Sequence, residues 1–157
     1  MIKNLNSQEK FWKGNFGNKY IKRNDFKKGI NNNVHLFKKI FKKNIRIKDL
    51  IELGPNIGHN TLAIKKIFRD LKITGVEINK KACQELKKIK NVEVINESIL
   101  SFKSVKKFDL VLAKGILIHI HPKYLKDLYK NIYKLSKKYV LFCEYYNPYP
   151  VSIKYRG

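Results

Sequence analysis

The chain has 157 residues, of which 43% are hydrophobic and 12% aromatic, and its 35 Lys and Arg against 12 Asp and Glu give a net charge of +23. This length suits one domain, and the apolar fraction is too high for a disordered chain. No apolar run approaches the roughly 18 residues of a membrane span, and the N-terminus lacks the apolar region of a signal peptide. We therefore expect a single globular domain in the cytoplasm, without membrane contact.

The excess of positive charge raises the question of an anionic partner. A basic surface of this size attracts nucleic acid, anionic lipids or anionic metabolites. Lys supplies nearly all of the charge, however, and Lys, Asn and Ile have A/T-rich codons, so a skewed genome would produce the same bias. The Lys residues also come as scattered pairs such as Lys38-Lys39, whereas polyanion interfaces usually cluster Arg with aromatic residues. Nucleic acid is therefore not the favoured partner.

The two cysteines, Cys83 and Cys143, lie far apart in the sequence. This spacing excludes a disulfide scaffold and a cysteine-based zinc site of ordinary spacing. We expect two reduced thiols, which are typical of a cytosolic protein, and no metal.

The first 44 residues are expected to form a helical region. Val34, Phe37 and Ile40 recur at helical spacing and predict a helix over 34–41, and Asn31–Asn33 predicts a turn before it. Four aromatic residues upstream fit either a lid over a ligand or plain packing on a sheet: Phe11, Trp12, Phe16 and Tyr20.

From residue 45 to 144 the pattern alternates between strands and helices. Short, mainly apolar segments predict five strands, over 49–53, 73–78, 91–95, 108–113 and 139–143. Helical spacing predicts a helix over 61–68, a second capped by Asn79, and a third with Pro122 in its first turn. Alternating apolar strands and helices predict a parallel sheet covered on both faces, a three-layer α/β/α fold of the Rossmann-like kind with right-handed crossovers.

In such a sheet, ligands bind at the carboxyl ends of the strands, so the residues after each strand carry the functional information. The first strand is followed by a loop with two glycines, Gly54 and Gly58, which allow a tight turn and a close approach of the backbone to a ligand. Asn56 stands where the dinucleotide fingerprint has its middle glycine, and no Gly-Lys-Ser/Thr of a phosphate loop follows. Glu52, two positions before Gly54, suits a ligand that carries an ammonium group.

Glu77 ends the second predicted strand. A carboxylate at this position can accept hydrogen bonds from two adjacent ribose hydroxyls. The alternative is a solvated glutamate at the end of a strand. The third strand is followed by Asn96–Ile99, where an adenine edge would lie.

Together these segments resemble the class I S-adenosylmethionine-dependent methyltransferases. The similar segments are Glu52–Gly58, Gly75–Asn79 and Phe108–Leu112, which correspond to the first, second and fourth motifs of that family. A closer resemblance is to the small methyltransferases named for their association with pseudaminic acid biosynthesis. It rests on these residues and segments: Gln8–Trp12, Gly17, Tyr20, Arg23-Asn24, Lys114–Ile120 and Glu144–Pro148.

The resemblance implies S-adenosylmethionine as cofactor and assigns it a set of binding residues. Gly54 and Gly58 would shape the loop under the methionine and ribose, with Asn56 adding bulk beside the cofactor. Glu52 would lie near the methionine ammonium, directly or through water, and Glu77 would take the ribose hydroxyls. The resemblance also implies that Ile78 lies against the adenine and that Lys114 lies near the methionine carboxylate or the acceptor. Many relatives place an acidic residue at the adenine amino group. Here Ser98, together with the Ile99 backbone, would take that place.

Methyl transfer requires a general base only if the acceptor must lose a proton. The candidates are His119, Glu144 and Tyr145. His119 lies between two isoleucines, so a packing histidine is an equal alternative, and His121, before Pro122, is expected to belong to the start of a helix.

The sheet predicted here stops early compared with that of the resembling family. That family has seven strands in the order 3-2-1-4-5-7-6, and only 14 residues follow the fifth predicted strand, so strands six and seven are expected to be missing. The fifth strand should then be an edge, covered either by the aromatic tail 145–157 or by a second copy of the chain in a homodimer.

Three functions stay open at this point. The first is transfer of a methyl group to a small acceptor, sugar-related or anionic. The second is a cofactor-binding module or remnant without transferase activity. The third is a nucleic-acid methyltransferase or binder, which requires Lys to gather on one face around the pocket.

Overall fold

The computed structural model describes residues 4–23, 26–41, 45–149 and 151, with side chains described from residue 29 onward in the second of these ranges. Five strands form one parallel sheet in the order β3-β2-β1-β4-β5, the order predicted above. Their bounds are β1 Asp49–Leu53, β2 Lys72–Val76, β3 Val92–Ile95, β4 Phe108–Lys114 and β5 Ser136–Cys143. The chain order reverses between β1 and β4, which pair directly, so a switch point lies at the centre of the sheet.

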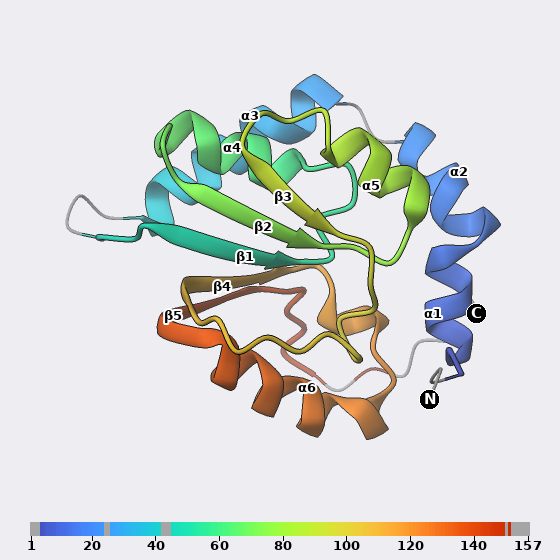
Figure 1. Ribbon diagram of the computed structural model, residues 1–157. Coiled ribbons are helices and arrows are strands. Elements are labelled where there is room, and N and C mark those ends of the chain that lie inside the picture. The colour runs from blue at the N-terminus through green and yellow to red at the C-terminus, as the bar shows by residue number, and fades with distance from the viewer. Residues whose placement is uncertain (1–3, 24–25, 42–44, 150, 152–157) are drawn as a thin grey trace.

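Helices cover both faces of the sheet and its carboxyl edge (Figure 1). The bounds are α1 Ser7–Lys13, α2 Asn15–Arg23, α3 Phe26–Ile40, α4 His59–Ile67, α5 Lys80–Leu86, the 3-10 turn η1 Leu117–His119 and α6 Pro122–Leu135. α3, α4 and α5 lie on one face and α6 on the other (Figure 1). α1 and α2 stand beside the strand ends of β1–β3 (Figure 1).

Two apolar clusters hold these layers together. Phe37 of α3 and Ile64 of α4 are fully buried against Leu50 of β1. Leu128 and Ile132 of α6 pack on the opposite face. Burial of side chains this large stabilises the fold by roughly 1.5–3 kcal/mol each, so both faces of the sheet are held firmly.

The predicted turn at Asn31–Asn33 is wrong, because these residues lie within α3. Ile30, Val34 and Phe37 continue one apolar face through this segment, while Asn31 and Asn32 face solvent. The packing of that face outweighs the weak helix propensity of Asn. The α3 helix therefore begins well before the predicted Val34.

β5 forms one edge of the sheet, as expected. It begins at Ser136, directly after α6 and three residues before the predicted start. Tyr139 and Phe142 are 45% and 43% exposed, and no strand follows β5 among the described residues. Tyr145 and Tyr146 in the described part of the tail are themselves exposed. The remainder of the tail expected to cover this edge, residues 150 and 152–157, lies outside the described residues.

Within the described ranges, no helix is both long and apolar enough to cross a membrane.

Candidate active site

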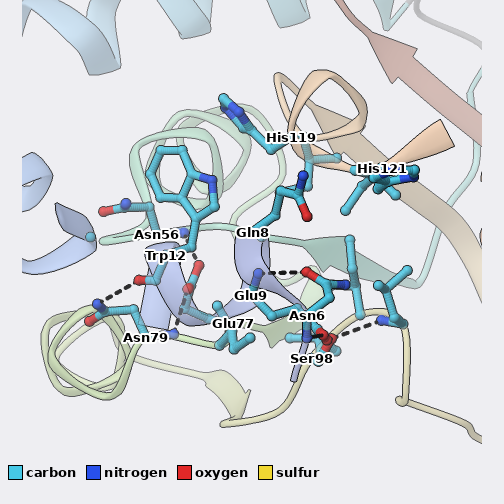
Figure 2. A pocket seen from close by; sticks show the side chains of 18 of the residues that line it. Asn6, Gln8, Glu9, Trp12, Asn56, Glu77, Asn79, Ser98, His119 and His121 are labelled. Carbon is cyan, nitrogen blue, oxygen red and sulfur yellow. Dashed lines mark hydrogen bonds between the residues drawn. The ribbon is translucent and has the colours of Figure 1, made fainter. Parts of the chain in front are cut away.

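A cavity of about 100 Å³ lies at the carboxyl end of the sheet. Its walls come from the segments after β1, β2, β3 and β4, and α1 closes it from the side (Figure 2). Of the twelve predicted site residues, seven line it: Gly54, Asn56, Glu77, Ile78, Ser98, Ile99 and His119. The topology thus brings together residues more than 60 positions apart in the sequence, because parallel strands end at the same edge.

The loop after β1 has the backbone conformation that its glycine predicts. Gly54 has a φ of +69°, in the left-handed region, and a Cβ there would lie 2.6 Å from Cδ1 of Ile116. Asn56 also has a positive φ, of 53°, and its Oδ1 accepts a hydrogen bond from the Ile57 N–H at 2.7 Å. Gly54 adds no side chain of its own to the cavity wall, which lets the Ile116 side chain pack directly against its backbone.

Glu77 follows β2 and is 6% exposed. Its Oε2 accepts from the Asn56 N–H and its Oε1 from the Asn79 N–H, both at 2.8 Å (Figure 2). Burial raises the pKa of Glu77, and the backbone hydrogen bonds from Asn79 and Asn56 oppose this shift. Each carboxylate oxygen has a second lone pair, so the group can accept further hydrogen bonds from a ligand in the cavity.

Ser98, after β3, donates a hydrogen bond to Oε1 of Glu9 in α1, a partner that the sequence analysis did not identify. Oε2 of Glu9 accepts from the Asn6 N–H at 2.8 Å, while the Glu9 N–H donates to Oδ1 of Asn6 at 2.9 Å. This reciprocal pair is a capping box, and its spacing predicts the start of α1. The motif gives no indication that Glu9 also lines the cavity.

Three predicted binding residues do not line the cavity. Glu52 is fully buried and points at α4, where its carboxylate accepts from Thr61 Oγ1 at 2.7 Å and Asn60 Nδ2 at 2.9 Å. Burial raises the pKa of Glu52, against these hydrogen bonds. Gly58, with a φ of +92°, lets α4 approach α5, since a Cβ there would meet Leu86 and Ile89. Lys114, at the end of β4, also stands outside the lining.

His119 ends η1 and lines the cavity opposite Glu77. The Trp12 ring packs against it with 4.6 Å between the ring centroids. Burial lowers the pKa of His119, which favours the neutral imidazole, the form that accepts a proton. His121 caps α6, as predicted: its Nδ1 accepts from the Lys123 N–H at 3.2 Å.

Neither Glu144 nor Tyr145 lines the cavity. Oε1 of Glu144 accepts from the backbone N–H groups of Ile116 and Leu117, at 3.0 and 3.1 Å, so the carboxylate ties the end of β5 to the loop that carries His119. Oε2 of Glu144 is buried and has no hydrogen-bond partner among the residues that the structure describes. Tyr145 is 82% exposed. The geometry gives Glu144 a positioning role and leaves the Tyr145 side chain outside the cavity.

Asn79 anchors α1, which borders the cavity. Its Oδ1 caps α5 by accepting from the Ala82 N–H, and its Nδ2 donates to the backbone carbonyl of Trp12 at 3.0 Å (Figure 2). A Cβ at Gly17 would lie 1.9 Å from the same carbonyl oxygen, so only glycine permits this approach. Of the four predicted lid aromatics, Trp12 lines the cavity, while Phe11 and Phe16 stack on each other at 4.0 Å.

The family of methyltransferase domains matches residues 51–138 of the chain. No curated protein sequence matches the chain. Among solved structures, magnesium protoporphyrin IX methyltransferase from Synechocystis PCC 6803 with bound S-adenosylmethionine has a TM-score of 0.68 at 11% identity, covering 90% of this chain and 77% of its own. The sugar N-methyltransferase KedS8 from Streptoalloteichus sp. ATCC 53650 has a TM-score of 0.63 at 14% identity, covering 86% and 55%. Phosphoethanolamine N-methyltransferase 1 of Haemonchus contortus, with phosphoethanolamine and S-adenosylhomocysteine, has a TM-score of 0.69 at 13% identity, covering 88% and 31%.

The fold and the family match define a Rossmann-like, class I methyltransferase, and the chain belongs to the methyltransferase-domain family. The cofactor of that family is S-adenosylmethionine. The chain spans less than two thirds of the length of most of the solved relatives. The cavity residues fit this cofactor. Glu77 supplies a nearly buried carboxylate with spare lone pairs, and Gly54 supplies a left-handed turn that carries no side chain of its own. Ile78 and Ile99 add apolar walls to the same cavity.

Proposed function

We propose that the chain transfers a methyl group from S-adenosylmethionine to a small acceptor, as an enzyme of class 2.1.1. The observation that carries the proposal is that Glu77 and His119 line the same cavity at the carboxyl end of the sheet. One is a buried carboxylate suited to two hydroxyls, and the other is a histidine whose pKa is lowered by burial, suited to accept a proton.

The proposed mechanism divides the cavity between cofactor and acceptor. Glu77 would hold the ribose, Ile78 and Ile99 would flank the base, and the Gly54 turn would lie under the remainder. The bound cofactor supplies an electrophilic methyl group on a sulfonium. His119 orients the acceptor and takes its proton where the acceptor must lose one, and Trp12 closes the site against water.

The lining of the cavity supports a small acceptor over nucleic acid. Among the described residues that line it, none is Lys or Arg. Cations gather instead along a separate open groove formed by α4 and the segment after it together with α5 and the segment after it: Lys65, Lys66, Arg69, Lys88 and Lys90. A nucleic-acid methyltransferase needs its phosphate contacts around the reacting base, where this chain has none among the lining residues.

A sugar-related or anionic acceptor is the finer proposal. It rests on the resemblance of Gln8–Trp12 and Lys114–Ile120 to the methyltransferases associated with pseudaminic acid biosynthesis, and on the similarity to a sugar N-methyltransferase and to an enzyme solved with phosphoethanolamine. His121 and Gln8 add polar groups to the cavity wall that can bind the hydroxyl groups of a sugar.

A second candidate is a module that binds the cofactor without turnover. Two observations favour it: Glu144 and Tyr145 lie outside the cavity, and the chain spans about half or less of several relatives. Such a module would bind S-adenosylmethionine and S-adenosylhomocysteine alike and form no product.

Calorimetry with S-adenosylmethionine and S-adenosylhomocysteine tests the cofactor, and a turnover screen on a metabolite extract tests the transfer. We expect binding of both, and formation of S-adenosylhomocysteine that falls about 10²–10⁴-fold in His119→Asn while cofactor binding persists. Binding without turnover in any fraction would favour the module. Failure to bind either compound would overturn the proposed function.

A further inference from the structure

The cavity wall has a second carboxylate whose role the family resemblance does not supply. Among the described lining residues, the carboxylates are Glu77 and Glu9. Glu77 lies after β2, whereas Glu9 comes from α1 and reaches Ser98 after β3, 89 positions away in sequence (Figure 2). The wall after β3 is otherwise neutral at this point, because Ser98 and Ile99 form it.

The contacts of Glu9 hold its carboxylate in place and leave acceptor capacity. Oε1 accepts from Ser98 Oγ and Oε2 from the Asn6 N–H. A carboxylate offers about four lone pairs, so at least one on each oxygen remains for a donor in the cavity. The apolar side chains of Ile78, Ile99 and Leu100 line the same region and suit the faces of a flat ring.

We propose that Glu9 recognises the exocyclic amino group of the adenine, so that the lid helix supplies the acidic group of the base subsite. This inference rests on the proposed function. An amino group donates to a carboxylate, whereas the oxo group of a 6-oxopurine would place an acceptor against it. Glu9 is therefore a specificity-determining residue, and Ser98 is a positioning residue that holds the Glu9 carboxylate at the strand end.

The same geometry links base recognition to the lid. The cavity of about 100 Å³ is small beside the roughly 300–1,000 Å³ of ordinary ligand sites, and α1 forms one of its walls. Asn79 holds the C-terminal end of α1 through the Trp12 carbonyl, while Glu9 lies near its N-terminal end. A hydrogen bond from an adenine to Glu9 would hold the N-terminal end of α1 against the base, and a 6-oxopurine would lack this hydrogen bond.

The test compares binding of S-adenosylhomocysteine with that of its 6-oxo analogue, S-inosylhomocysteine, by calorimetry. We expect the native protein to prefer the adenine compound by about ten- to hundredfold, the range for one hydrogen bond to a charged group. Glu9→Gln keeps the capping box and can turn either its carbonyl or its amide toward the base, so the preference should fall to below threefold, with tighter binding of the 6-oxo compound than in the native protein. A mere loss of stability would weaken both ligands alike.

Glu97→Gln is the matched control, because this carboxylate adjoins Ser98 in sequence but bonds Ser101 Oγ and does not line the cavity. It should leave the preference unchanged. A native protein that binds both compounds equally, or a Glu9→Gln variant that keeps the native preference, would overturn the inference while the proposed function stands. Tighter binding of both compounds in Glu9→Gln would show that Glu9 blocks the subsite, which also overturns it. A native protein that binds neither compound would overturn the proposed function and this inference together.

Discussion

The side-chain amide of Asn79 donates a hydrogen bond to the backbone carbonyl of Trp12, 67 positions earlier in the sequence, at 3.0 Å. One residue thereby caps α5 and fixes the end of the helix that closes the cavity. The lid and the strand end that carries Glu77 are thus joined through a single side chain. Asn79 can be altered so that one of these two contacts is lost and the other is kept.

Asn79→Ser is expected to release α1 while keeping the helix cap, because the shorter hydroxyl replaces the capping oxygen and the Nδ2 amide group that reaches the Trp12 carbonyl is removed. Amide hydrogen exchange in α1 should become faster, and the free energy of unfolding should fall by about 0.5–1.5 kcal/mol. Asn79→Ala loses both contacts and should cost roughly a further 1 kcal/mol. Unchanged exchange in α1 of Asn79→Ser would show that the lid is held elsewhere.

Glu77→Ala should lower the affinity for S-adenosylmethionine at least tenfold, because two hydrogen bonds to a charged acceptor would be lost. The variant also leaves the Asn56 and Asn79 N–H groups without their acceptor, so unfolding in denaturant should become easier by about 1–3 kcal/mol. Binding is therefore measured by calorimetry without denaturant, at a temperature at which circular dichroism shows that the variant is folded. If a folded variant bound the cofactor with native affinity, Glu77 would not be a cofactor-binding residue.

Gly54→Ala and Gly115→Ala form a matched pair. Both glycines have a left-handed φ, of +69° and +64°, so each alanine should cost about 1–2 kcal/mol through the backbone. A Cβ at Gly54 would meet Ile116 Cδ1 at 2.6 Å, whereas one at Gly115 would meet no atom within 4 Å among the described residues beyond its two chain neighbours. We expect Gly54→Ala to be the less stable variant in urea unfolding. Equal free energies of unfolding in the two variants would mean that the Ile116 side chain moves aside without destabilising the fold.

Glu144→Gln should keep most of the activity, because its amide oxygen can still accept from the Ile116 and Leu117 N–H groups. Glu144→Ala removes that acceptor, and the loop that carries His119 should lose its position, so turnover should fall while cofactor affinity changes little. Steady-state kinetics with both variants separate the two roles. Equal loss in both would instead indicate that the Glu144 carboxylate itself takes a proton.

The stability of the fold should depend on the protonation of His119. Because burial lowers its pKa in the folded state, the unfolded chain binds the proton more readily. The contribution of the neutral His119 to the free energy of unfolding is fully present above about pH 6.5, the ordinary pKa of histidine. It is lost as the pH falls from there toward the lowered pKa of the folded state. Urea midpoints of the native protein and His119→Asn at several pH values should therefore diverge below pH 6.5. Parallel curves would contradict the shift.

We propose that the exposed edge of β5 supports weak self-association. Tyr139, Val140 and Phe142 are each more than a third exposed there, while the charge of +23 opposes association at low salt. Light scattering should show a dimer that strengthens as salt rises, and Val140→Lys should weaken it. If the protein stayed monomeric across the salt series, the proposed self-association through the β5 edge would be wrong.

The sequence alone was sufficient for the five strands, the turn at Gly54 and the placing of Glu77 at the carboxyl edge of the sheet, whereas the order of the strands came from the resemblance to the methyltransferase family. These features depend on local patterns: apolar segments of strand length, glycine where φ is positive, and a residue that directly follows a strand. The parallel topology then brings the ends of the strands together, so the neighbourhood of Gly54, Glu77 and Ser98 follows from chain order.

Only the tertiary structure decided where several side chains point and which distant partner they meet. Glu52 shares the face of β1 with Leu50, because side chains alternate along a strand, and therefore turns to α4 rather than to the cavity. Glu144 meets the Ile116 loop, and Glu9 meets Ser98, through packing of elements that are remote in sequence. Local propensity carries no information on such contacts, because they depend on how whole elements dock against one another.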